Sequence, residues 1–220
     1  MHLINFAMKN IIISILVFIM LATSCKKPPT YYINSDMKAA FNFPVGSYWV
    51  YKDSLSGQID SFYVAKNDPS FIHYSDHSVE RLDLYISECS TNNNWQDSSQ
   101  WYFQMSSDFI SLRIVKYSLQ KPNGYPLYEE WLIQYPFKLG IIPNTIIGTL
   151  TNIFPSYTVN GVSFSNVAEI DDSIYNGVST NSFHDWYYLC PNVGFVKMRL
   201  DYPTDSINRI WELQHYYIKK

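Results

Sequence analysis

Glycine and charged residues are both scarce in this sequence of 220 residues. Only 8 residues are glycine, and no phosphate-cradling glycine pattern is found among them. Charged residues make up 16% of the chain, whereas an average globular protein has about a quarter. The formal net charge is −3, so the chain lacks the basic excess of nucleic-acid-binding proteins. We therefore expect no nucleic-acid partner.

The sequence also lacks two common catalytic motifs. It has no Gly-x-Ser-x-Gly, because the stretches that begin at Gly161 and Gly177 miss the second glycine of a nucleophile elbow. It has no His-Glu-x-x-His of a zinc protease either. His184 and Asp185 could orient a base, but their nearest serine, Ser182, belongs to no catalytic pattern. We expect a protein that is not an enzyme and carries no cofactor.

The sequence supports a metal site no better than it supports a catalytic site. His73, His77 and Glu80 have the spacing of ligands on one helix face, but serines crowd the stretch and its neighbours follow a β-strand period. We interpret this stretch as a solvated loop, since a metal site needs fixed geometry. The carboxylates of Asp171 and Asp172, near Glu169, are interpreted as a solvated turn rather than a calcium site.

Aromatic residues are abundant. The chain has 6 Trp, 19 Tyr and 13 Phe, which is 17% of its residues, and apolar types reach 47%. Such a composition excludes intrinsic disorder, which requires low hydrophobicity and high charge. Aromatic residues also suit β-strands and cross-strand pairing.

The N-terminus holds one apolar run, residues 11–21, preceded by Lys9. As a helix this run would measure about 16 Å, too short for a hydrocarbon core about 30 Å thick. We interpret it as the apolar region of a signal peptide rather than a membrane span.

The run ends in Leu21-Ala-Thr-Ser-Cys25, followed by Lys26-Lys27. This segment resembles the lipobox of bacterial lipoproteins, in particular those of Bacteroidetes-type bacteria, with Leu21 four positions before the cysteine rather than three. The resemblance implies removal of residues 1–24 and acylation of Cys25, with palmitate as one chain. Two or three acyl chains anchor a protein stably. Surface-exported members of that group carry acidic residues where this chain has lysines, so we expect an outer-membrane lipoprotein facing the periplasm.

The mature chain has a two-residue period from about residue 43. Pro28-Pro29 favours an extended tether over residues 25–40, with one helical turn at residues 36–41 capped by Asn34 or Ser35. We expect strands at residues 46–53, 59–66, 81–88, 100–105, 109–117, 130–135, 156–159, 162–169, 185–190, 194–202 and 209–218. Turns are expected at Ser56-Gly57, Asn160-Gly161 and Pro191-Asn192.

The predicted fold class is all-β, with few short helices. A single antiparallel meander of nine to eleven strands must curl into a half-barrel, a barrel or a two-sheet sandwich to hide its apolar face. Residues 41–220 are expected to form one β-rich domain. The segments 43–51 and 186–197 are similar to the opening strand and closing hairpin of uncharacterised Bacteroidetes-type lipoproteins. That resemblance implies a β domain and no activity.

Two thiols remain beside Cys25. Cys89 and Cys190 could form a disulfide in an oxidising periplasm, and a loop of about 100 residues would gain about 4.7 kcal/mol in the chain-entropy model. The alternative is two separately buried thiols.

Three functions stay open at this stage. The first is a non-catalytic binding or scaffold module whose curved, aromatic-lined sheet cradles an apolar ligand; a filled concave face would contradict it. The second is a sugar- or protein-binding module that uses the aromatics Trp95, Trp101 and Tyr102 in and beside a polar loop. The third is an envelope hydrolase with a site near His184.

Overall fold

The computed structural model describes residues 27–90, 99–107, 111–118, 127–139, 149–173, 184–202 and 207–220, some of them by their backbone alone. The elements are β1 (Thr30–Tyr31), α2 (Ser35–Phe41), β2 (Tyr48–Asp53), β3 (Ile59–His73), β4 (Ser78–Ser90), β5 (Ser99–Ser106), β6 (Ser111–Ser118), β7 (Leu127–Gln134), β8 (Thr149–Val159), β9 (Val162–Ser173), β10 (His184–Cys190), β11 (Gly194–Tyr202) and β12 (Ile207–Tyr217).

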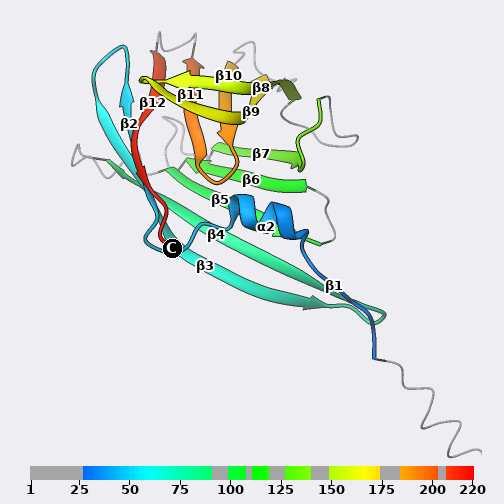
Figure 1. Ribbon diagram of the computed structural model, residues 1–220. Coiled ribbons are helices and arrows are strands. Elements are labelled where there is room, and N and C mark those ends of the chain that lie inside the picture. Colours follow the sequence, from blue (N-terminus) through cyan, green and yellow to red (C-terminus); the bar gives the residue numbers. More distant parts are fainter. Residues whose placement is uncertain are drawn as a thin grey trace, which may run out of the picture.

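All the described strands belong to one sheet, in which β2 to β12 follow the order β7-β6-β5-β4-β3-β2-β12-β11-β10-β9-β8. It consists of two meanders, an N-terminal wing (β2 to β7) and a C-terminal wing (β8 to β12), joined by antiparallel pairing of β2 with β12. The wings curl toward each other into a half-barrel (Figure 1). Of the three predicted arrangements, the half-barrel is the one that the protein adopts. The sheet is mixed rather than purely antiparallel, because β1 pairs with β4 in parallel.

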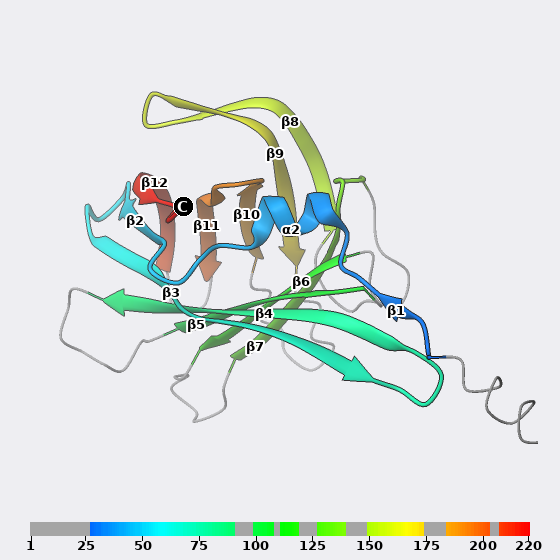
Figure 2. The same ribbon diagram turned by 60° about the horizontal axis from the view of Figure 1, so that its bottom comes forward.

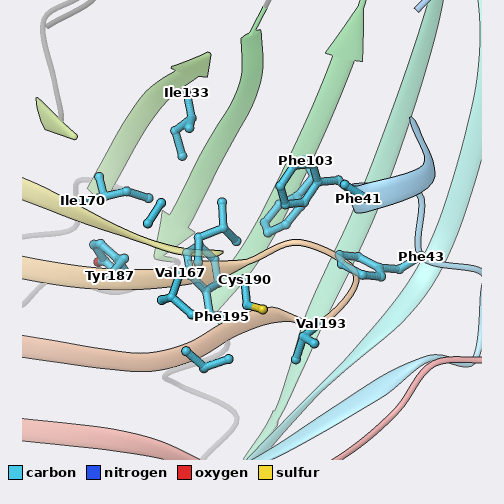
Figure 3. Packing of buried hydrophobic residues seen from close by; sticks show 14 of the residues in the cluster. Phe41, Phe43, Phe103, Ile133, Val167, Ile170, Tyr187, Cys190, Val193 and Phe195 are labelled. Carbon is cyan, nitrogen blue, oxygen red and sulfur yellow. The ribbon is translucent and has the colours of Figure 1, made fainter. Parts of the chain in front are cut away.

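The core lies on the inner faces of the two wings. Alternate residues of β4, Leu82, Leu84 and Ile86, are buried as their period predicts. Phe103 of β5 meets Phe195 of β11 edge to face, with ring centroids 5.7 Å apart. Figure 3 shows side chains from both wings packing together in this space. The two sheet halves therefore share one hydrophobic core.

Helix α2 closes the mouth between the wings (Figure 2). Asn34 caps it as predicted, its side chain accepting from the backbone of Asp36 and Met37. The helix buries Met37, Ala40 and Phe41. The backbone N–H of Asn192, in the β10–β11 turn, donates to the Ala40 carbonyl at 2.7 Å. The helix is thus part of the core.

The structure differs from the prediction in the N-terminal segment. Residues 25–40 were expected to form a tether, yet the segment from Thr30 onward packs on the domain. Thr30 pairs with Ser78, and the side chain of Ile33 is 5% exposed. Pro28 and Pro29 directly precede the short parallel strand β1. The two-residue β1 was not foreseen, because so short a strand has no period to read.

Candidate binding surface

Of the three residues of the predicted aromatic site, only Tyr102 is described with its side chain. Trp95 lies outside the described residues, and Trp101 is described by its backbone alone. Tyr102 lies on β5, where it opposes Tyr85 of β4. Its ring is partly buried and contacts that of Tyr85 at 5.1 Å between centroids.

Tyr102 belongs to a polar network on β4 and β5. The Arg81 guanidinium donates to both carboxylate oxygens of Asp83, at 2.9 and 2.8 Å, and to the Tyr102 hydroxyl at 2.7 Å. The Gln104 amide donates to Asp83 at 3.1 Å and to Tyr102 at 2.9 Å. The pKa of Tyr102 is raised to about 12. Burial is the largest cause, and the hydrogen bond with Asp83 is the second. These groups satisfy one another, which is the pattern of a structural network.

The residues considered for a metal site are not brought together. His73 is the last residue of β3 and His77 lies in the turn before β4, so the predicted loop is limited to residues 74–77. Glu80 lies inside β4, where its carboxylate accepts from Lys38 Nζ at 2.6 Å and from the Ile33 backbone at 3.1 Å. In the part of the chain that the structure describes, no three acidic, His or Cys side chains could share a metal ion.

Two other expectations concern the C-terminal wing. Residues 171–172 were predicted to be a turn, which was wrong, because both lie inside β9, paired with Trp186 and Asp185 of β10. The side chains of His184 and Asp185 lie outside the described part. The hypothesis of a hydrolase site near His184 therefore stays untested.

Cys190 is a buried free thiol. Its Sγ lies 3.5 Å from the carbonyl oxygens of Ser165 and Pro191, and burial raises its pKa to about 11. The Cys89 side chain lies outside the described residues. Because Cys190 is a free thiol, the predicted Cys89–Cys190 disulfide is not formed in this structure. Counting alkylated thiols in the unreduced, denatured protein would test the pairing in the exported protein.

The concave face is filled by side chains. A cavity of about 20 Å³ remains between the wings, which is room for about one water molecule. Aromatic side chains from both wings line it, among them Phe43, Trp49 and Phe103. No lipid-sized apolar site is preformed in this cavity, so the structure does not favour the apolar-ligand hypothesis. Among the described helices, none has the length and hydrophobicity to cross a bilayer.

The outer face of the C-terminal wing carries a cluster that was not predicted from the sequence. Tyr187 and Leu189 of β10 face the core, so the neighbouring Trp186 and Tyr188 lie on the opposite face. The ring of Tyr157, from β8, stacks on that of Tyr188 with centroids 4.9 Å apart and planes 16° apart. Phe154 adjoins the Tyr157 ring at 5.1 Å.

Charged groups border these rings. Burial, followed by the charge of Glu169, raises the pKa of Tyr188, whose hydroxyl is hydrogen-bonded to that carboxylate. Thr151 Oγ1 also donates to Glu169, at 2.7 Å. Next along the same row, Lys197 Nζ pairs with Glu212 at 2.9 Å, each side chain about a quarter exposed. Hydrogen bonds and ion pairs thus fix the positions of these side chains.

A second aromatic–cation pair extends this face. The Arg199 guanidinium lies 4.5 Å from the centre of the Trp186 ring, which is cation–π geometry. Trp186 and Arg199 are directly opposite each other on β10 and β11. Arg199 is exposed and the four aromatic residues are partly buried; we call the group of Phe154, Tyr157, Trp186, Tyr188 and Arg199 the outer aromatic surface.

The β8–β9 hairpin holds Phe154 and Tyr157 in place. It arches over the ends of β10 to β12 (Figure 2). At its turn the Asn160 side chain donates to the Leu213 carbonyl of β12 at 2.9 Å. Phe164 contacts Tyr216 of the same strand at 6.4 Å between ring centroids. The two-residue period of the sequence can assign Tyr157 and Tyr188 to a face of their strands. Only the register between the strands shows that the two rings meet.

The comparisons with known proteins give only a weak structural likeness. No protein-family model matches the sequence, and no curated protein matches it. A solved candidate lipoprotein from Parabacteroides distasonis ATCC 8503 is 12% identical, with a TM-score of 0.43. A solved candidate exported protein with a YmcC-like fold from Bacteroides fragilis NCTC 9343 is 11% identical, with a TM-score of 0.42. Each alignment covers 81% of this chain and 99% of the other chain.

Proposed function

We propose that this protein is a lipid-anchored, non-catalytic module of the cell envelope that binds a protein partner through its outer aromatic surface. The lipid anchor is argued from the lipobox-like segment ending at Cys25. It would attach the protein to the outer membrane, with the domain in the periplasm. The partner class is argued from the surface itself.

The chemistry of the outer aromatic surface supports this partner class. Trp, Tyr and Arg are the residue types most enriched among binding hot spots between proteins, and here Trp186, Tyr188 and Arg199 are neighbours on one sheet face. Their side chains are held by ring contacts and hydrogen bonds, so little side-chain freedom is lost on binding. Lys197, Glu212 and Glu169 supply charges of both signs at the border.

The alternatives fit the geometry less well. An apolar ligand needs an enclosed apolar volume, which a cavity of about 20 Å³ does not provide. A sugar chain would use an open ring face for stacking. The nearly parallel Tyr157 and Tyr188 rings instead cover one face of each other.

Site-specific photo-crosslinking in cells tests the proposed partner class. We expect a benzophenone amino acid in place of Tyr157 to give a discrete adduct of higher mass that contains a second protein. Tyr63 is the matched control, because it is a tyrosine on the N-terminal wing with a 43% exposed side chain. A Trp186→Ala, Arg199→Ala double variant should lower the adduct yield about tenfold or more, as expected for hot-spot residues.

Three results would contradict the proposal. Equal adducts from positions 157 and 63 would indicate random collisions. No protein adduct from position 157, together with binding of envelope polysaccharide by the purified protein, would replace the protein partner with a sugar. An adduct that survives the double variant would place the contact elsewhere.

The lipid anchor is tested separately. We expect the mature protein to have the mass of residues 25–220 plus acyl chains and to sediment with membranes. A Cys25→Ser variant should lose the acyl mass and leave the membrane fraction. An unmodified Cys25 in the membrane-bound protein would contradict the anchor without affecting the partner proposal.

A further inference from the structure

The turn between β3 and β4 carries an exposed group of aromatic side chains. Tyr74 is 45% exposed and stacks on His77, with ring centroids 4.6 Å apart. Tyr31 of β1 packs edge-on against the same His77 ring at 5.7 Å. Tyr32 and Phe71 make a similar edge contact at 6.2 Å, and they are 67% and 47% exposed. We call these five residues the aromatic tip.

The N-terminal segment is fixed directly beside the aromatic tip. The backbone N–H of Ser78 donates to the Pro29 carbonyl at 2.9 Å, and Thr30 pairs with Ser78 in the parallel ladder. At the C-terminal end of β1, Ser107 Oγ donates to the Tyr31 carbonyl at 3.1 Å. The chain therefore leaves the domain at this tip, where both views place β1 next to the β3–β4 turn (Figures 1 and 2).

Chain length then limits how far the tip can lie from a bilayer. Four peptide steps separate Cys25 from Pro29, and a fully extended chain covers at most about 3.6 Å per residue. If Cys25 carries acyl chains, Pro29 lies within about 15 Å of the membrane surface. The aromatic tip, which lies beside Pro29, is then held close to the membrane.

The chemistry of the aromatic tip matches that position. Tyrosine rings are enriched at membrane–water interfaces, where the ring contacts apolar groups and the hydroxyl stays in water. Among the described residues, the charged groups around the tip are few and of both signs. Lys27 precedes it, Asp76 accepts from His77 Nδ1 at 2.7 Å, and Lys38 is paired with Glu80. The tip therefore has no large excess of one charge, and its contact with a membrane would depend on the aromatic rings.

We propose that the aromatic tip docks into the headgroup region of the membrane that holds the lipid anchor and so fixes the orientation of the domain. This inference rests on the proposed acylation of Cys25. β3 and β4 form a long arm, and 15 residues of β3 at about 3.3 Å each span about 50 Å. Docking at one end of this arm would leave the outer aromatic surface, on the other wing, free to meet a partner.

Depth-dependent fluorescence quenching tests the docking. The full chain is produced in a host that acylates it, with a small fluorescent amino acid in place of Tyr74. It is then reconstituted into phosphatidylethanolamine–phosphatidylglycerol vesicles that contain headgroup-nitroxide lipids. Leu55 is the matched control position, because it is 60% exposed and lies in the turn at the other end of β3. A label at Tyr32 provides a second position in the tip.

We expect the labels at positions 74 and 32 to be quenched at least about twofold more strongly than the label at position 55, because interfacial side chains lie within about 5–10 Å of the headgroup boundary. Equal quenching at all three positions in an acylated protein would overturn docking and leave the anchor standing. A mature protein that carries no acyl chain would overturn both. Intact mass measured on the same sample separates these two failures.

Discussion

At the scale of single residues, Asp53 links the two wings. It ends β2 with a carboxylate that is 2% exposed. The carboxylate accepts from Leu55 and Ser56 in the following turn and from the backbone of Ile210 on β12 at 3.0 Å. Ser54 N–H donates back to the Ile210 carbonyl at 2.8 Å. One buried side chain therefore holds both a turn and the β2–β12 pairing.

The ionisation of Asp53 makes stability depend on pH. Burial opposes the charged form, but the hydrogen bonds from Ser56, Ile210 and Leu55 together outweigh burial and lower the pKa of the carboxyl in the folded protein. A lowered folded pKa means that the stabilisation is complete above the unfolded value of about 3.9 and is lost as the pH falls below it. We expect Asp53→Asn to lower the free energy of unfolding by about 1–3 kcal/mol at pH 7.

Urea denaturation at pH 7 and at pH 3 measures this effect. The difference between the wild type and Asp53→Asn should shrink at pH 3, where the wild type begins to lose the same charge. Asp68→Asn is the control, because Asp68 is 47% exposed in a surface pair with Lys66, and its loss should be about 1 kcal/mol or less. A difference that grows toward pH 3 would contradict the assignment.

Gly194 is a second critical residue, because its backbone has φ +97° and faces the Trp49 ring. A Cβ there would lie 3.3 Å from Nε1 of Trp49, which donates to the Val193 carbonyl. We expect Gly194→Ala to cost about 2–4 kcal/mol, the sum of a left-handed backbone and overpacking. Gly57 has φ +76° with open space around it, so Gly57→Ala should cost only about 1–2 kcal/mol. Equal losses in urea denaturation would show that the Trp49 contact is unimportant.

At the scale of elements, α2 connects the mouth of the half-barrel to both wings. Phe41 is fully buried and meets Tyr135 and Phe137, which follow β7, at 5.2 and 6.2 Å between ring centroids. The same turn of helix is hydrogen-bonded to Asn192 in the other wing. The helix therefore supports the curvature of the sheet.

Removing the Phe41 ring should destabilise the whole domain. We expect Phe41→Ala to lower the free energy of unfolding by about 3–5 kcal/mol, as for other buried aromatics. Lys38→Ala on the same helix should cost about 1 kcal/mol or less, because that side chain is 36% exposed in its pair with Glu80. Thermal or urea unfolding compares the two variants. Similar losses would indicate that α2 is peripheral.

The element boundaries show where sequence reasoning works and where it does not. The turns at Asn160-Gly161 and Pro191-Asn192 were predicted correctly, because Asn160, Gly161 and Asn192 adopt the positive φ that these residue types tolerate. The strand predicted to end at residue 66 continues to His73 through Pro69. Proline is tolerated there because β2 pairs only with residues 59–63 of β3, so Pro69 has a ladder partner on one side alone.

At the scale of the whole molecule, the pairing of β2 with β12 defines a centre and two edges. β2 and β12 each have a strand on both sides. In the described structure, β8 pairs with β9 alone and β7 with β6 alone. The sequence predicted the hairpins within each wing but not this junction, because pairing between distant strands leaves no local signal. The outer aromatic surface was missed for the same reason.

Hydrogen exchange should reveal this centre. We expect the slowest amides in β2, β11 and β12, exchanging only on global unfolding, and faster exchange in β7 and β8, whose edges lack a second partner. Mass spectrometry of proteolytic peptides gives the order. Protection that is greatest in β5 and β6 would show instead that the N-terminal wing is the more stable unit.

The β2–β12 junction also determines when the sheet can be completed during export. Ser47 Oγ accepts from the backbone of Lys219, 172 residues later. A chain that crosses a membrane with its N-terminus first, as the proposed export requires, would deliver β2 early and β12 last. The N-terminal wing can pair as it emerges, but its innermost strand keeps an open edge until translocation is almost complete. Such an edge invites pairing with other chains, so export would demand a holding factor or rapid completion.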